Sequence, residues 1–249
     1  MGADAVSAAE SDAALAARLA KAAGELLVAL REETAFEGPA LGSEGDRRAN
    51  ALILAGLREA RPGDAILSEE SRDDKTRLGR SRVWIVDPLD GTREYREQRS
   101  DWAVHVALAV DGVAAAGAVA LPALGLMLRS DQPEPLPPAV DPPRMVVSRT
   151  RPPIAAERVA EALGAERIEM GSAGAKAMAV VRGQAEIYLH AGGQHEWDNC
   201  APAAVAAAHG LHCSRLDGSP LAYNRADTLL PDLLICRPEW AEKVIDAAS

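Results

Sequence analysis

Apolar positions in the first part of the chain recur with the period of an α-helix. Apolar residues three or four positions apart predict an amphipathic helix that ends near residue 31: Leu15, Leu19, Ala22, Leu26 and Leu30. Ser7 followed by Glu10 resembles the capping box that begins many helices. We therefore expect this helix to begin just after Ser7.

A second helix is expected to begin at Asp46, because aspartate is a favoured N-cap residue. The segment before it contains four residues that are unfavourable in helices and is predicted to be a loop: Gly38, Pro39, Gly42 and Gly45. Ala49, Ile53 and Leu57 form the apolar face of this helix, and Pro62 ends it. Asp46 is thus expected at a junction between loop and helix.

Short apolar runs predict buried strands at residues 65–67, 83–86, 102–108, 113–119 and 126–128. The segment DQPEPLPPAVDPP, residues 131–143, contains six prolines and predicts an extended connector. Strands and helices then alternate, with strands at 145–147, 167–170, 187–189 and 233–236 and helices at 154–163, 175–181, about 201–208 and after Pro238. We expect one catalytic unit, 1–249, with an N-terminal lobe, 1–130, and a C-terminal lobe, 144–249.

The composition excludes several classes of protein. The chain has 249 residues, 48% of them hydrophobic, and a formal net charge of -10. Such an acidic protein is not expected to read a nucleic-acid backbone, because that task requires clustered lysine and arginine. An acidic protein that handles an anionic substrate usually needs a cation between them, so a metal ion is expected.

The cysteines, the first residues and the apolar runs of the chain indicate a cytoplasmic protein. Three scattered cysteines, Cys200, Cys213 and Cys236, predict reduced thiols and no disulfide framework. The first residues lack the basic and apolar regions of a secretory signal peptide. Apolar runs are too short to span a bilayer, so no membrane partner is expected.

The segment WIVDPLDGT, residues 84–92, carries the most informative chemistry. A buried strand delivers Asp87 and Asp90 to a turn, and burying two carboxylates is costly unless a cation or strong hydrogen bonds compensate them. Magnesium takes such hard oxygen ligands and retains waters that a phosphate can displace. Gly91 lets the backbone approach a ligand, and amides from Gly91 onward would bind an anion if they open a helix.

Two other acidic segments have the same potential. Glu69 and Glu70 follow another short strand, and Asp198 precedes the helix expected from about residue 201, with Pro202 in its first turn. Any one of these acids is more often a solvated side chain or a helix cap. Their combination with the Asp87–Asp90 turn favours a metal site.

This combination resembles the inositol monophosphatase superfamily, with its acidic pair after a strand, its D-P-x-D-G-T turn and its late W-D before a helix. Within this superfamily, the chain is most similar to the CysQ-type 3'(2'),5'-bisphosphate nucleotidases of actinobacteria. Four segments carry this similarity: RVWIVDPLDGTREY, DWAVHVAL, GSAGAKAMAVV and RLDGSPLAYN. The resemblance extends over nearly the whole chain, to about Cys236. It implies an α/β fold: the layered α-β-α-β-α sandwich of inositol monophosphatase and fructose-1,6-bisphosphatase.

The resemblance also implies roles for individual residues. Glu69, Asp87 and the Leu89 carbonyl would hold one magnesium ion, and Asp87, Asp90 and Asp198 a second. Glu70 is expected to lie next to these ligands without binding the metal itself.

Asp46 corresponds to the aspartate that orients the attacking water together with the motif threonine, here Thr92. The resemblance also implies a weakly held third magnesium ion that would bind this water. Lithium is expected to compete at a magnesium position.

The expected reaction is attack of water on a phosphate monoester, with metal ions stabilising the attacking and leaving oxygens. No covalent phosphoenzyme is needed, and the chain lacks the GxSxG and Cys-x5-Arg signatures of serine and cysteine nucleophiles. The histidines show no metal-ligand spacing and are interpreted as core or surface residues: His105, His190, His195, His209 and His212.

The substrate is expected to be a phosphorylated small molecule, with 3'-phosphoadenosine 5'-phosphate preferred and its sulfated precursor also possible. The glutamate that inositol phosphatases carry before W-D is replaced by the stretch LHAGG, residues 189–193, and the usual T-x-x-D is here Ser43-Glu44-Gly45-Asp46. Gly171, Ser172 and Lys176 lie where the nucleotidases build a substrate wall. Lys176 either meets a second phosphate or simply exposes its charge.

Three alternatives stay open from the sequence. The chain could hydrolyse inositol-1-phosphate or fructose-1,6-bisphosphate instead, or it could be a catalytically silent sensor that binds nucleotide or metal. Family resemblance implies a monomer or a homodimer and a role linked to sulfate assimilation.

Overall fold

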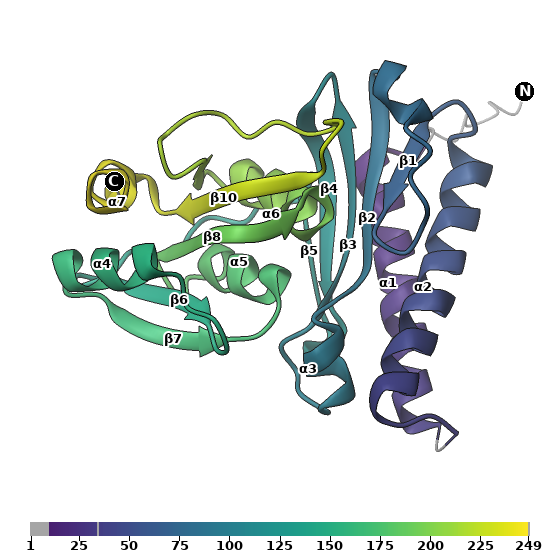
Figure 1. Ribbon diagram of the computed structural model, residues 1–249, viewed down its shortest axis with the longest axis horizontal. Coiled ribbons are helices and arrows are strands. Elements are labelled where there is room, and N and C mark those ends of the chain that lie inside the picture. Colours follow the sequence, from purple (N-terminus) through teal and green to yellow (C-terminus); the bar gives the residue numbers. More distant parts are fainter. Residues whose placement is uncertain (1–9, 34, 249) are drawn as a thin grey trace, which may run out of the picture.

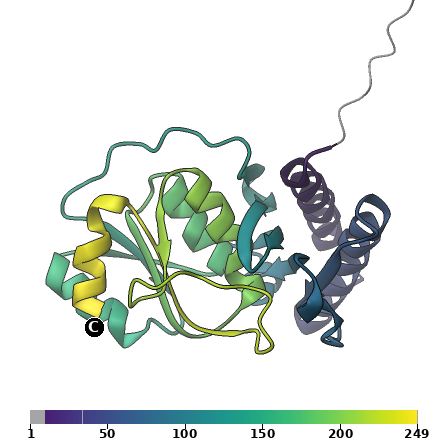
Figure 2. The ribbon, with the colours of Figure 1, turned by 90° about the horizontal axis from the view of Figure 1, so that it is seen from above.

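The computed structural model describes residues 10–33 and 35–248, which form five layers (Figure 1). A pair of helices covers the outer face of one five-stranded sheet, two helices separate this sheet from a second one, and two further helices cover the far face of the second sheet. Figure 2 shows the same succession from above. The expected α/β fold, a layered α-β-α-β-α sandwich, is confirmed.

The first sheet has the strand order β1-β2-β3-β4-β5. Its strands are β1 (Ala65–Ser68), β2 (Arg82–Asp90), β3 (Ala103–Val110), β4 (Val113–Leu121) and β5 (Leu126–Arg129). β1 and β2 are parallel, whereas the other neighbours are antiparallel. All five strands expected in this part of the chain are present. β2 is longer than expected, because it continues through the acidic motif to Asp90.

The two outer helices begin at other residues than the sequence suggested. α1 (Asp12–Glu32) is capped by Ser11, whose Oγ accepts a hydrogen bond from the Ala14 N–H over 3.1 Å; Ser7 lies outside the described residues. α2 (Gly38–Ala60) includes the segment predicted as a loop, so the prediction that Asp46 caps this helix is wrong. Pro39 is tolerated because it lies in the first turn, where its missing N–H would have no partner.

The second sheet has the strand order β7-β6-β8-β10-β9. Its strands are β6 (Arg144–Ser148), β7 (Glu166–Met170), β8 (Ile187–His195), β9 (His212–Ser214) and β10 (Leu229–Cys236). β6 runs parallel to both β7 and β8, while β10 is antiparallel to β8 and β9. β9 was not predicted from the sequence. Residues 131–143 contain no helix or strand and link β5 to β6.

Two helices from the later part of the chain fill the space between the sheets (Figure 1). They are α5 (Ala173–Val181) and α6 (Glu196–Ala208). α6 packs against β2, β3 and β4 of the first sheet as well as β8, β9 and β10 of the second. A buried apolar cluster joins both sheets through these helices, including Val119 from β4, Val205 from α6 and Leu233 from β10. The two halves therefore share one core.

The remaining helices lie at the periphery. α4 (Ile154–Leu163) and α7 (Ala241–Ala248) pack together on the far face of the second sheet, and α3 (Thr92–Arg96) follows β2 directly. Short 3₁₀ segments complete the described chain: η1 (Thr76–Gly79), η2 (Pro122–Leu124) and η3 (Pro238–Trp240). None of the helices within residues 10–33 and 35–248 has the length and apolar character needed to cross a membrane.

Candidate active site

The end of β2 is shaped so that two carboxylates leave the strand close together. The pairing of β2 with β3 shifts register between Asp87 and Asp90. The Leu89 N–H donates to Asp87 Oδ1 over 3.0 Å, and the Thr92 hydroxyl donates to the Leu89 carbonyl over 3.2 Å. Gly91 follows with a φ of +86°, a conformation that favours glycine, and α3 begins at once.

Asp87, Asp90 and Asp198 converge on one point. Each offers a carboxylate oxygen, and these three atoms lie within 4.8 Å of one another. Asp198 enters from the first turn of α6, where its Oδ2 accepts a hydrogen bond of 2.5 Å from the His195 N–H. A set of carboxylate oxygens at this spacing suits a hard divalent cation. This acidic cluster could therefore hold a metal ion.

The start of α6 differs from its predicted position near residue 201. The helix begins at Glu196 because His195 and Asp198 form a capping box that stabilises the first turn. Pro202 consequently lies inside the helix and not in its first turn. The earlier start places Asp198 on the helix itself, facing the end of β2.

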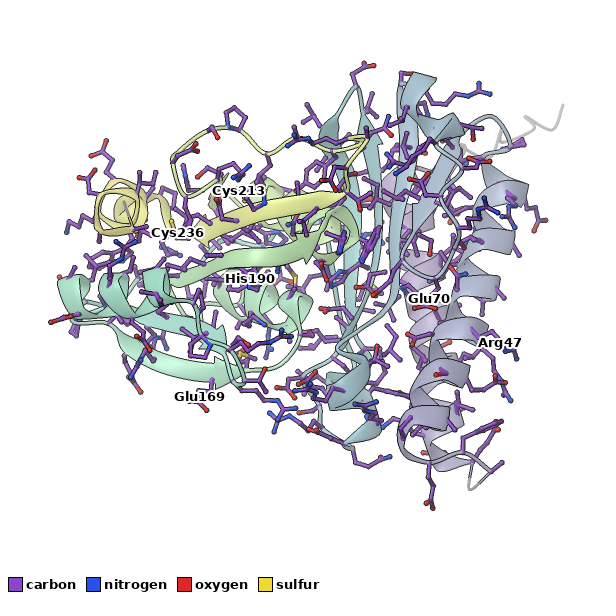
Figure 3. The ribbon with its side chains drawn as sticks, in the orientation of Figure 1. Arg47, Glu70, Glu169, His190, Cys213 and Cys236 are labelled. Carbon is purple, nitrogen blue, oxygen red and sulfur yellow. The ribbon has the colours of Figure 1, made fainter. Side chains whose placement is uncertain are left out.

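Glu69 joins the cluster from the neighbouring strand. β1 is parallel to β2, and the Glu69 N–H donates to the Val86 carbonyl over 3.2 Å just beyond the paired residues. This brings the Glu69 carboxyl within hydrogen-bonding reach of the Asp87 carboxyl. Glu70 lies beside α2 (Figure 3).

The electrostatics of this cluster favour a bound cation, because the pKa values of three of its carboxyl groups are raised. Burial, followed by repulsion from Glu69, Asp90 and Asp198, raises the pKa of Asp87 well above its usual range. Burial and the charge of Asp90 raise the pKa of Asp198 to about 7. Burial also raises the pKa of Glu69. Buried carboxylates that repel one another in this way are compensated by a cation, so the donor set fits a metal ion.

Asp90 accepts hydrogen bonds from the start of α5. The backbone N–H groups of Ala173 and Gly174, at the start of α5, donate to its two oxygens over 3.2 Å and 2.6 Å. Burial acts to raise its pKa, but the charge of His105 and these hydrogen bonds outweigh that effect and lower it. Asp90 is thus held as a carboxylate in a fixed orientation.

Asp46 lies near the acidic cluster on α2. Burial and repulsion from Glu70 and Glu69 raise the pKa of Asp46 to about 8. One turn earlier on the same helix, Gly42 lies against Thr92, and a Cβ on Gly42 would be 2.7 Å from Thr92 Cγ2. The close packing of α2 against α3 brings the helix of Asp46 and the motif threonine to the same side of the site.

Gly171 and Ser172 form a wall across from the turn. A Cβ on Gly91 would lie 2.8 Å from Ser172 Cβ, so the two segments touch. The Gly171 N–H donates to Asp101 Oδ2 over 2.6 Å, which fixes the wall to the first sheet's side of the molecule. The Ser172 hydroxyl caps α5 by accepting a hydrogen bond from the Ala175 N–H over 2.9 Å.

Lys176 is buried beneath this wall, with only 4% of the residue exposed. Its ammonium donates to the carbonyls of Gly171 and Ser172, the latter over 2.8 Å. Burial lowers the pKa of Lys176 to about 8. The interpretation that Lys176 simply exposes its charge is therefore wrong, because the side chain supports the wall from inside.

Two other basic residues, His190 and Arg151, lie on the same side of the site. His190 lies on β8 (Figure 3), half-buried, and its Nε2 is 2.8 Å from the Gly192 carbonyl oxygen. Burial lowers the pKa of His190, and the positive charges of Lys176 and the exposed Arg151 lower it further. The charges of Lys176 and Arg151 thus favour the neutral form of His190 beside the wall.

His105 is a site residue that the sequence analysis missed. It lies opposite Asp87 in the pairing of β2 with β3, and none of its surface is exposed. Its Nε2 is 3.2 Å from Asp90 Oδ2. The strand pattern showed only that position 105 lies on a strand, whereas the antiparallel register decides that it lies beside the acidic motif.

The sequence matches known proteins over most of its length. Residues 8–249 match the model of the inositol monophosphatase family. A 3'-phosphoadenosine 5'-phosphate phosphatase from Mycobacterium leprae (strain TN) is 54% identical over 253 residues, covering 93% of this chain and 91% of that protein. The 3'(2'),5'-bisphosphate nucleotidase CysQ of Escherichia coli (strain K12) is 30% identical over 197 residues, covering 74% of this chain and 80% of that protein.

Solved structures show the same architecture. CysQ from Bacteroides thetaiotaomicron aligns with a TM-score of 0.78 and 26% identity, covering 92% of this chain and 97% of that one. Inositol monophosphatase II from Staphylococcus aureus MSSA476 aligns with a TM-score of 0.79 and 20% identity, covering 93% of both chains. Together with the family model that spans nearly the whole sequence, these alignments show that the chain belongs to the inositol monophosphatase family.

Proposed function

We propose that this protein is a magnesium-dependent phosphatase that removes the 3'-phosphate from 3'-phosphoadenosine 5'-phosphate. The convergence of Asp87, Asp90 and Asp198 from two distant parts of the chain carries the proposal. Identity of 54% to a phosphatase named for this substrate supports the choice of nucleotide. The sulfated precursor, 3'-phosphoadenosine 5'-phosphosulfate, offers the same 3'-phosphate and is a second substrate in this proposal.

The acidic residues divide into two overlapping sets of metal ligands. Glu69, Asp87 and the Leu89 carbonyl would hold one magnesium ion, and Asp87, Asp90 and Asp198 a second, so Asp87 would belong to both sets. Magnesium supplies positive charge that offsets the phosphate oxygens and lowers the pKa of water. Asp46, which is repelled by Glu69 and Glu70, would help to hold a third, weakly bound magnesium ion.

Asp46 and Thr92 are proposed to orient the attacking water. The Thr92 hydroxyl donates its hydrogen to the Leu89 carbonyl. Its oxygen therefore keeps lone pairs that can accept a hydrogen bond from water. Burial and repulsion from Glu70 and Glu69 keep Asp46 mostly protonated at pH 7 in the metal-free protein. A bound cation would favour its carboxylate, which is the form that accepts a proton from water. The phosphate transfers directly to water, and no side chain forms a covalent intermediate.

The wall beside the metal cluster favours a substrate with a second anionic group. Lys176 and Arg151 bring positive charge to this side of the site. The Lys176 ammonium is buried, donates to the carbonyls of Gly171 and Ser172 and lies 5.4 Å from the centre of the Tyr188 ring. Its charge would therefore attract an anionic group from behind the wall. Gly91, Thr92, Gly171 and Ser172 would contact the rest of the substrate.

The substrate choice is tested by phosphate release at equal magnesium concentration from four compounds. We expect 3'-phosphoadenosine 5'-phosphate to give the highest kcat/KM, ahead of adenosine 5'-phosphate, inositol-1-phosphate and fructose-1,6-bisphosphate. Equal or better turnover of inositol-1-phosphate would overturn the ranking, and no turnover of any compound would favour a silent nucleotide or metal sensor.

Lithium at millimolar concentration is expected to inhibit the reaction. A cytoplasmic location, a monomer or homodimer, and a link to sulfate assimilation stay predictions.

A further inference from the structure

His105 lies beside Asp90 and beside the backbone next to Asp198, but it is not one of the proposed metal ligands. It is fully buried on β3, behind the end of β2. Among the described residues, the group whose oxygen atoms could share one cation consists of Asp87, Asp90 and Asp198, and His105 is not part of it. Its ring nitrogens instead face groups from two different elements.

One nitrogen fixes the orientation of the ring. His105 Nδ1 is 3.0 Å from the Trp197 carbonyl oxygen. A carbonyl only accepts hydrogen bonds, so Nδ1 must carry a hydrogen and donate it. Trp197 directly precedes Asp198 on α6, and this bond therefore ties the backbone beside Asp198 to β3.

The other nitrogen faces Asp90. His105 Nε2 lies 3.2 Å from Asp90 Oδ2, a distance typical of an ion pair, although no partner is aligned with it in hydrogen-bonding geometry. Asp90 is also held by the N–H groups of Ala173 and Gly174. Gly174 has no side chain, and a Cβ at this position would collide with His105 Nε2. The ring thus fills a space that only a glycine on α5 leaves open.

We propose that His105 is a positioning residue that holds the Asp90 carboxylate and the Asp198 segment of α6 at a fixed separation. Asp90 comes from β2 and Asp198 from α6, and the ring contacts Asp90 through Nε2 and the residue before Asp198 through Nδ1. Groups that orient metal ligands change metal affinity when they are removed, typically by a factor of roughly 10 to 100. This inference rests on the proposed metal-dependent function.

Two isosteric substitutions separate the contacts of the ring. The amide nitrogen of asparagine can occupy the place of Nδ1, so His105→Asn keeps a donor for the Trp197 carbonyl and loses the contact to Asp90. The amide nitrogen of glutamine reaches the place of Nε2, so His105→Gln keeps a donor for Asp90 and loses the bond to α6. His209→Asn is the matched control, because His209 follows the far end of α6 and its side-chain Nδ1 lies 2.8 Å from the Val205 carbonyl oxygen.

The decisive measurement is calorimetric titration of Mg²⁺ into each metal-free protein, with thermal unfolding of the same samples. We expect His105→Asn to weaken magnesium binding about tenfold or more. We expect His105→Gln to weaken it less, and the control to bind as wild type. The loss of turnover in His105→Asn should recover as magnesium is raised, because the damage lies in how the ligands are held.

Each other outcome overturns a particular statement. Variants that unfold at a lower temperature but bind Mg²⁺ with wild-type affinity would show that His105 has a packing role only. An equal loss in the asparagine and control variants would show that the effect is unspecific. Wild-type protein that binds no Mg²⁺ would instead refute the proposed function, which keeps the two failures distinguishable.

Discussion

At the scale of single residues, the buried carboxylates make the metal-free protein sensitive to pH. Asp46 has a usual pKa of 3.8, which burial and the charges of Glu70 and Glu69 raise to about 8 in the folded chain. The folded state therefore binds this proton more tightly than the unfolded state. The stabilisation from this group is complete below about pH 4 and is lost as the pH rises toward 8.

We predict that the free energy of unfolding of the metal-free protein falls between pH 5 and pH 8, and that it falls less in Asp46→Asn. Asp198, whose pKa is raised to about 7, contributes in the same direction and leaves part of the slope in the variant. Urea unfolding in the presence of a chelator at pH 5, 6, 7 and 8 measures both slopes. Identical slopes in the two proteins would show that Asp46 is not held in the protonated form.

The acidic residues of the site were identifiable from the sequence, whereas their supporting partners were not. Asp87 and Asp90 stand in a motif, and Asp198 follows a tryptophan in the same order as in the family. His105 lies in an ordinary apolar strand, and only the register of β2 against β3 places it beside Asp87. Lys176 was noted as basic, but its burial beneath Gly171 and Ser172 depends on tertiary packing.

At the scale of secondary-structure elements, the start of α2 shows where local propensity fails. Glycine is unfavourable inside a helix, so the segment containing Gly42 and Gly45 was predicted as a loop. In the structure these glycines face the end of β2 and α3, and a Cβ on Gly45 would lie 3.2 Å from both Leu89 and Tyr95 side chains. Close packing at the site, rather than helix propensity, decides these residue types.

We predict that Gly42→Ala lowers kcat while leaving the fold intact. The new methyl group would lie 2.7 Å from Thr92 Cγ2 and displace the threonine proposed to orient water. Misplacement of such a group by about 1 Å can cost roughly 100-fold in rate, and we expect a loss of about 10- to 100-fold. The helix itself should gain up to about 1 kcal/mol of propensity, which limits any loss of stability.

Gly63→Ala is the matched control for this substitution. Gly63 follows α2, and a Cβ there would meet no atom within 4 Å. Steady-state kinetics and thermal unfolding of both variants distinguish an effect on the site from an effect of added methyl groups. Wild-type kcat in Gly42→Ala would mean that Thr92 tolerates displacement or does not orient the water.

At the scale of the whole molecule, the site depends on how the two halves are layered. The sequence predicted most strands and helices, but not which strands are neighbours. β6 lies between β7 and β8, and α6 from the second half packs on β2, β3 and β4 of the first sheet. These contacts are non-local, so only the resemblance to the family implied the layered order. The short β9 and α3 carry too few residues to show a periodic pattern.

This layering explains why the acidic cluster can act as one unit. Asp87 and Asp90 end a strand of the first sheet, while Asp198 lies on a helix packed between both sheets. The helix also connects to the second sheet, because β8 leads directly into it. A cation bound by all three residues would link the halves of the molecule at the place where the phosphate reacts.

The most direct test of the account is a magnesium titration of the metal-free protein in the presence of 3'-phosphoadenosine 5'-phosphate, with phosphate release followed continuously. We predict no release in chelator, a saturable rise as Mg²⁺ is added, and loss of nearly all turnover in Asp90→Asn at every magnesium concentration. Turnover that persists in chelator, or an Asp90→Asn variant that matches wild type, would contradict it.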